Sequence, residues 1–203
     1  MTRSAVFAPF EIIEGARDRG LVLLADHARR DLPEEYGDLG LPPEERQRRI
    51  ERYYRPYHDA ISAMIASVAK ASRRAPLIMA VHSFTPVMQG HVRPWHVGVL
   101  WDMDHRAAWP LIEMLSADPK MVVGDNEPYD GALRGDTMFR HAIVKGYAHA
   151  LIEIRQDLIA DDAGAEAWAE VLAPIVDAIN RRPDIHEVQK FGSRTGPVEG
   201  VVQ

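Results

Sequence analysis

The chain of 203 residues contains no cysteine. It therefore has no disulfide framework, no thiolate nucleophile, and no zinc or iron–sulfur site of the cysteine type. Nine histidines and 30 acidic residues remain as ligands. Any metal ion must be bound by His, Asp or Glu.

The sequence also lacks an excess of basic charge and a long apolar run. Its 24 Lys and Arg against 30 Asp and Glu give a formal charge of −6, which argues against binding to nucleic acid or to an anionic membrane. No stretch approaches the roughly 18 apolar residues of a membrane span, and acidic residues stand where a signal peptide would be apolar. We therefore expect a soluble, cytoplasmic protein, and the sequence leaves its oligomeric state open.

Hydrophobic residues make up 46% of the chain, enough for a core, and the length predicts one domain over residues 1–203. Short apolar runs alternate with helical patterns, which is typical of α/β layers. The runs predict strands at residues 21–26, 77–83, 96–102, 121–124 and 149–157. The patterns predict helices at residues 44–68, with a kink or break at Pro56, and at 107–116, 137–145 and 163–180. For the polar tail, residues 183–203, we expect no fixed structure.

Several predicted strands end in ionisable residues, and in open α/β sheets ligands bind at the carboxyl ends of the strands. His27 and His82 each follow an apolar run directly. Two imidazoles and a carboxylate with one open position would hold Zn²⁺ and activate a bound water. The pair favours this interpretation, although for either histidine alone a strand cap that bonds a neighbouring loop is the favoured explanation.

Glu153 lies inside the apolar run at residues 150–154. A buried carboxylate is costly unless it is paired or binds a metal. It is either a general base or metal ligand, or one half of a salt bridge with Arg155 or Arg140. The sequence leaves these alternatives open.

Two loops offer side chains for a ligand. Arg93 precedes a predicted strand, and Arg is suited to bidentate binding of a carboxylate. The polar turn that follows residue 125 would present Asn126, Glu127 and Tyr129, or would be a turn without a ligand.

Five segments carry a resemblance to a known family. They are LADHA (residues 24–28), LGL (39–41), HSFTPVMQGHVRPWHVGVLWDMD (82–104), VGDNEPYDG (123–131) and LIEIRQDL (151–158). Together they resemble the N-formylglutamate amidohydrolase family over most of the chain.

The resemblance implies a zinc-exopeptidase-like, three-layer α/β/α fold with a mixed, mostly parallel sheet. It also implies hydrolysis of the amide of N-formylglutamate or of a related small-molecule N-acyl amino acid. Transferred to this chain, the metal ligands for Zn²⁺ or another divalent cation would be His27 and His82, and the catalytic carboxylate would be Glu153. The substrate pocket would be lined by Arg93, Asn126, Glu127, Tyr129 and Arg155.

The chain departs from the family pattern after Leu41. Relatives usually carry a further segment there, which contributes acidic and Arg residues near the site, whereas here Pro42 and Pro43 lead almost directly into the next helix. Asp26 would be a local substitute for a third metal ligand, although the resemblance does not single it out. The departure keeps a second hypothesis open, in which the protein binds an acidic amino-acid derivative or a partner without catalysis.

Overall fold

The computed structural model describes residues 8–26 and 42–198. A five-stranded sheet forms its centre, with the strand order β1-β2-β7-β5-β6, and a two-stranded hairpin lies beyond it. The strands are β1 (Leu21–Leu24), β2 (Leu77–Phe84), β3 (Val87–Met88), β4 (His91–Val92), β5 (Val97–Leu100), β6 (Val123–Asp125) and β7 (His149–Arg155). β1, β2 and β7 are parallel, and β5 pairs with β7 in the antiparallel sense and with β6 in the parallel sense. The predicted mixed, mostly parallel sheet is confirmed.

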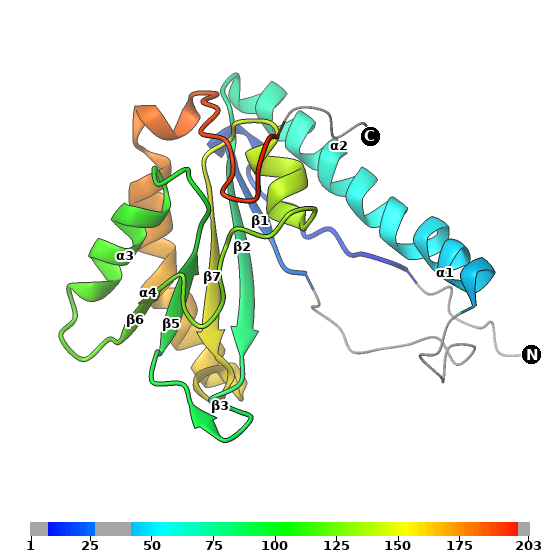
Figure 1. Ribbon diagram of the computed structural model, residues 1–203. Coiled ribbons are helices and arrows are strands. Elements are labelled where there is room, and N and C mark those ends of the chain that lie inside the picture. Colours follow the sequence, from blue (N-terminus) through cyan, green and yellow to red (C-terminus); the bar gives the residue numbers. More distant parts are fainter. Residues whose placement is uncertain (1–7, 27–41, 199–203) are drawn as a thin grey trace, which may run out of the picture.

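Helices cover both faces of this sheet, with α2 on one face and α3 and α4 on the other (Figure 1). The α-helices are α1 (Pro43–Arg49), α2 (Arg55–Ser72), α3 (Ala108–Ser116) and α4 (Asp162–Asn180). The shorter helical segments are the π-helical η3 (Ile50–Tyr54) and η4 (Phe139–Ile143) and the 3₁₀ segments η1 (Arg17–Arg19), η5 (Gln156–Ile159) and η6 (Pro183–His186). None of the helices described between residues 8 and 198 is long and apolar enough to cross a membrane.

Two hydrophobic clusters hold the layers together. On the face of α3 and α4, Leu111 and Ile152 are almost fully buried, together with Trp168 and its helical neighbours. On the other face, Ile61, Ile65 and Val68 of α2 pack against β1 and β2. The first half of β2 is buried on both sides, as expected for a central strand of a largely parallel sheet.

Each long helix has a local reason for where it begins. The Asp161 side chain caps α4 by accepting a hydrogen bond from the Gly164 amide, which satisfies one of the orphan donors of the first turn. Pro56 lies in the first turn of α2, but the residues before it are helical too, so its missing amide hydrogen and its ring disturb the helix at this point. The expected break at this proline takes the form of the π-helical segment η3, so α1, η3 and α2 follow one another as a helical arm (Figure 1).

The expectation of an unstructured tail from residue 183 is wrong for the residues described, up to 198. Ile185 of η6 is completely buried in the core formed with α3 and α4. Arg194 is bonded to three residues of the main body. The polar composition of this segment suggested that it has no fixed structure. Its contacts with the rest of the protein are largely polar, through charged side chains and backbone hydrogen bonds.

We expect Leu111→Ala to lower the free energy of unfolding by about 2–5 kcal/mol, because Leu111 has no exposed surface and its truncation leaves a cavity. Met114→Ala on the same helix is the control. Its side chain is 39% exposed, and we expect a loss below about 1 kcal/mol. Chemical denaturation followed by circular dichroism measures both, and equal losses would contradict the described packing of α3.

Candidate active site

The carboxyl ends of β1, β2 and β7 bring three ionisable side chains into one row. Leu24 pairs with Ala80, and His82 pairs with Glu153. Asp26 lies two positions beyond Leu24, as His82 lies two positions beyond Ala80. Side chains alternate between the two faces of a sheet, so Asp26, His82 and Glu153 project from the face that α2 covers. His82 Nε2 and Asp26 Oδ2 are 3.6 Å apart.

Asp26 is held by hydrogen bonds from neighbouring elements. The Tyr57 hydroxyl on α2 donates to Asp26 Oδ1, and the side chains of Thr137 and His82 also bond to this carboxylate. Burial opposes the negative charge, but these hydrogen bonds outweigh it and lower the pKa of Asp26 to about 2. Asp26 is therefore ionised at neutral pH, while burial and the Asp26 charge raise the pKa of Tyr57.

Glu153 lies deeper in the sheet, and only 6% of the residue is exposed. Its Oε2 atom has no hydrogen-bond partner among the described residues. Burial raises the pKa of Glu153, although the charges of His82 and Arg93 oppose the shift. The hydrogen bond to Asp26 raises the pKa of His82 against its burial, with the charge of Glu153 adding to the effect. The surroundings of His82 are thus anionic.

The structure does not support a structural salt bridge for Glu153. Arg155 instead pairs with Asp157, at 2.7 Å between Nε and Oδ1, and its guanidinium also donates to the carbonyls of Pro94 and Trp95 at 3.4 Å. Arg140 donates to the Tyr54 hydroxyl. Arg155 therefore anchors the loop before β5, next to Arg93, and its part in substrate binding stays a prediction.

Arg93 is buried close to Glu153, at the start of the loop between β4 and β5. Its Nη1 atom donates to the Tyr129 hydroxyl at 3.0 Å and to the Thr85 carbonyl at 3.4 Å. Its guanidinium also stacks on the Tyr129 ring, at 4.9 Å from the ring centroid. Within the described part of the chain, no carboxylate lies within 4.0 Å of the Arg93 guanidinium, although the more distant charge of Glu153 acts on it. Arg93 and Tyr129, two of the residues predicted to line a substrate pocket, are thus in direct contact.

The loop after β6 reaches this group by crossing the face of the sheet. Gly98 of β5 pairs with Glu153 on one side and with Gly124 on the other. A Cβ atom at either glycine would lie within 2.6 Å of the Glu127 carbonyl oxygen, so only glycine lets the loop lie so close. The Glu127 backbone therefore lies next to Glu153. The Asn126 side chain stabilises the loop itself. Its Oδ1 accepts hydrogen bonds from the backbone amides of Trp101 and Gly131, at 2.9 and 3.0 Å.

Three residues near the row were missed by the sequence prediction: Tyr57, Thr137 and Asp136. Burial, with the charge of Asp26 added, raises the pKa of Asp136 to about 6, although its Oδ1 accepts the Phe139 amide. Asp136 stands directly before a predicted helix, and this capping position was its only signal in the sequence. Nothing in the sequence singled out Tyr57, which resembles an ordinary apolar position of α2.

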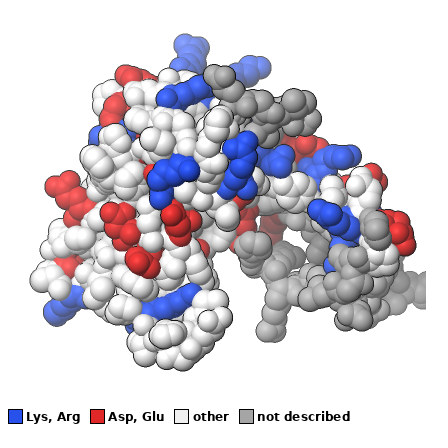
Figure 2. All heavy atoms as spheres, viewed as in Figure 1, with Lys and Arg blue, Asp and Glu red and all other residues white. Residues whose placement is uncertain are grey.

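His27, expected as a metal ligand, lies outside the described residues. Among residues 8–26 and 42–198, no three His, Asp or Glu side chains are grouped as a metal site. Within the row, His82 Nε2 and Asp26 Oδ2, at 3.6 Å from each other, are the pair of atoms that could share a cation. Figure 2 shows acidic and basic side chains interspersed over the face in view.

A buried histidine pair lies behind Tyr57. His58 Nδ1 and His141 Nε2 are 2.8 Å apart, and the two rings stack at 5.0 Å between centroids. Burial lowers the pKa of His58, with the positive charge of Arg140 adding to the effect. Burial, the neighbouring His58 and Arg140 lower the pKa of His141 to about 4. The pair therefore joins α2 to η4 as two neutral rings, one donating to the other.

The strand order, with helices on both faces of the sheet, defines an α/β protein with a mixed, mostly parallel sheet. A family model described as N-formylglutamate amidohydrolase matches residues 17–160. The chain belongs to this family, as its sequence motifs predict. The match ends before α4, so α4, η6 and the segment around Arg194 lie outside it.

A solved structure supports the same fold. The crystal structure of gene product Atu2144 from Agrobacterium tumefaciens is 32% identical to this chain, with a TM-score of 0.61. The similarity covers 70% of this chain and 58% of that one, so this chain spans less than two thirds of that protein's length. A comparison with curated proteins finds no match.

We expect acid to destabilise the protein through the histidine pair. The pKa of His141 is about 4 in the folded protein and about 6.5 when unfolded. The unfolded chain therefore binds more protons between these values, so this contribution is complete above pH 6.5 and is lost as the pH falls towards 4. The loss of unfolding free energy from pH 7 to pH 5 is expected to be smaller in His141→Gln than in the wild type.

His91→Gln is the matched control, because His91 is exposed on the hairpin of β3 and β4. It should retain the wild-type dependence on pH. Urea denaturation at both pH values measures the difference. An unchanged slope in His141→Gln would show that the pair does not titrate as described.

Proposed function

We propose that this protein is a metal-dependent amidohydrolase that cleaves the amide of N-formylglutamate or of a related N-acyl amino acid. Membership of the family suggests amidohydrolase activity. The observation that carries the proposal is Glu153 Oε2, a carboxylate oxygen that is buried without a hydrogen-bond partner in the described chain, next to His82 and near Arg93. A carboxylate oxygen that is buried without a partner among the described residues is costly for stability, which favours a functional role for Glu153.

Two of the described residues have donor atoms at a separation compatible with a shared metal ion. The distance of 3.6 Å between His82 Nε2 and Asp26 Oδ2 is close to the roughly 3.3 Å that separates two donors of a tetrahedral zinc ion with bonds near 2.0 Å. The anionic surroundings of His82 favour a cation at this point. Proteins of this family generally depend on a metal. We therefore assign Zn²⁺ or another divalent cation to His82, with Asp26 as a further donor and His27 as the ligand implied by the family motif.

When bound, the cation supplies Lewis-acid activation of a water molecule and of the amide carbonyl. Glu153 accepts the proton that the water loses as its oxygen bonds to the carbonyl carbon. Glu153 then delivers this proton to the amide nitrogen as the carbon–nitrogen bond breaks, which releases a free amine and a carboxylic acid. The raised pKa of Glu153 suits both transfers, because a carboxyl group tuned towards the working pH accepts and returns a proton readily.

Arg93 supplies the affinity for the amino-acid part of the substrate. It is a buried guanidinium whose hydrogen-bond partners, Tyr129, Thr85 and Met88, are all uncharged. A carboxylate of the substrate would provide a direct, bidentate contact with a counter-charge. This arrangement favours an N-acyl amino acid over a neutral amide.

We expect Glu153→Gln to lower kcat about 100- to 10,000-fold on N-formylglutamate, because the proton acceptor is lost. Bound metal should remain close to the wild-type stoichiometry. His82→Ala should lose both activity and metal. Elemental analysis of the purified protein and an assay of released formate measure the two quantities.

Glu170→Gln and His91→Ala, both at exposed positions, are the matched controls and should retain wild-type activity and metal. Full activity and full metal in His82→Ala and Glu153→Gln would refute the proposal. Metal and ligand binding by the wild type, without turnover of any N-acyl amino acid, would favour the alternative of a binding protein without catalysis.

A further inference from the structure

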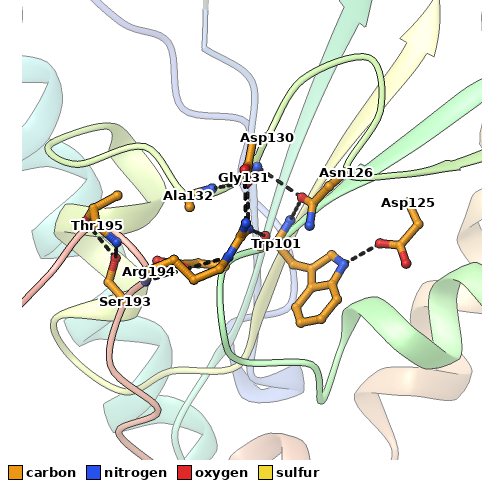
Figure 3. A network of polar contacts seen from close by, with 10 residues as sticks. Trp101, Asp125, Asn126, Asp130, Gly131, Ala132, Ser193, Arg194 and Thr195 are labelled. Carbon is orange, nitrogen blue, oxygen red and sulfur yellow. Dashed lines mark hydrogen bonds and ion pairs between the residues drawn. The ribbon is translucent and has the colours of Figure 1, made fainter.

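The segment that follows η6 contacts the loop that carries Tyr129 (Figure 3). The Arg194 guanidinium binds Asp130 in a bidentate fashion, with Nη1 to Oδ2 at 2.9 Å and Nη2 to Oδ1 at 2.6 Å. Nη2 also donates to the Trp101 carbonyl at 2.9 Å, and the Arg194 amide donates to Asp102 Oδ1 at 2.9 Å. One residue near the end of the described chain thus contacts the loop after β6 and the residues after β5 together.

These contacts amount to more than an exposed ion pair, which alone contributes little. The Asp102 side chain is fully buried, and Arg194 Nε lies 3.3 Å from its Oδ1. Arg194 lowers the pKa of Asp130 through a hydrogen bond and its charge. Arg134, beyond the loop, also donates to the Pro197 carbonyl at 3.0 Å. Residues 193–197, which we call the C-terminal clamp, are therefore fastened at several points.

The loop itself, residues 126–131, is tied to the sheet through Trp101. Asn126 Oδ1 accepts the amides of both Trp101 and Gly131, and the Trp101 indole donates to Asp125 Oδ1 at 2.6 Å (Figure 3). These bonds fix the two ends of the loop relative to each other. The ion pair of Arg194 with Asp130 holds the loop at a further point. Because Asp130 directly follows Tyr129 in the chain, a shift of Asp130 would also move Tyr129.

Tyr129 in turn positions Arg93 by accepting its hydrogen bond and stacking on its guanidinium. We propose that Arg194 is a positioning residue, through which the C-terminal clamp holds loop 126–131 so that Tyr129 and Arg93 bind the carboxylate of the substrate. The statement that Tyr129 and Arg93 bind the carboxylate of the substrate rests on the proposed function. The clamp itself lies outside residues 17–160, the part of the chain that the family model matches.

The test compares Arg194→Ala and Arg194→Lys in the full-length, metal-loaded protein. We expect Arg194→Ala to raise KM for N-formylglutamate about tenfold while kcat changes less than about threefold, because substrate binding is weakened and the proton transfers are not. Arg194→Lys should lie in between, since Lys keeps the charge but cannot form the bidentate contact. Amide hydrogen exchange of residues 125–132 should be at least about threefold faster in Arg194→Ala.

Arg182→Ala is the matched control. Arg182 forms a similar Arg–Asp pair, at 2.7 Å with Asp184, and its side chain is 41% exposed against 42% for Arg194. This variant should leave KM and exchange in the loop unchanged. Asp130→Asn is a second route to the same contact, and it should raise KM like Arg194→Ala, with no further increase in the double variant.

The outcomes separate the two proposals. Wild-type KM and wild-type exchange in Arg194→Ala would overturn the role of the clamp, whatever the substrate. Equal effects in Arg182→Ala would overturn it as well, because the change would then be general. If the wild type hydrolyses no N-acyl amino acid, the proposed function fails, while faster exchange confined to residues 125–132 still supports the clamp.

Discussion

The parallel register of β1, β2 and β7 is the constraint on which the site depends. Leu24 of β1 pairs with Ala80 of β2, and His82 of β2 pairs with Glu153 of β7. Because the three strands run in the same direction, the residues at their carboxyl ends lie at the same edge of the sheet. The three buried apolar runs that form these strands thus place Asp26, His82 and Glu153 side by side without any sequence proximity. A slip of one residue in either pairing would turn one of these side chains to the opposite face.

The charges in this row are balanced by groups from other elements. Asp26 is stabilised as an anion by hydrogen bonds from Tyr57 on α2 and from Thr137 beside η4. Glu153 receives no such bond on Oε2 within the described residues, and its pKa shifts in the opposite direction. Two carboxylates in one row therefore acquire different properties from their surroundings, one permanently charged and the other able to gain and lose a proton.

The sequence predicted the parts of this arrangement that follow from local pattern. Apolar runs located the strands, and the ionisable residues at their ends located His82 and Glu153. Tyr57 and Asp136 were missed because their roles arise from tertiary contacts that no spacing encodes. The prediction for the tail was wrong for the same reason, because Arg194 is held by partners that lie 64 and 92 residues away along the chain.

The antiparallel pairing of β5 with β7 explains why loop 126–131 can be held by the C-terminal clamp, which is distant from the row. β5 and β6 are antiparallel to β7. β6 therefore ends at the edge of the sheet opposite Asp26, His82 and Glu153. The loop after β6 must fold back across the sheet to bring Tyr129 to Arg93. Gly98 and Gly124 provide the space for this return. A loop that leaves from the far edge needs an anchor at that edge, and this is where Trp101, Asp102 and Arg194 meet.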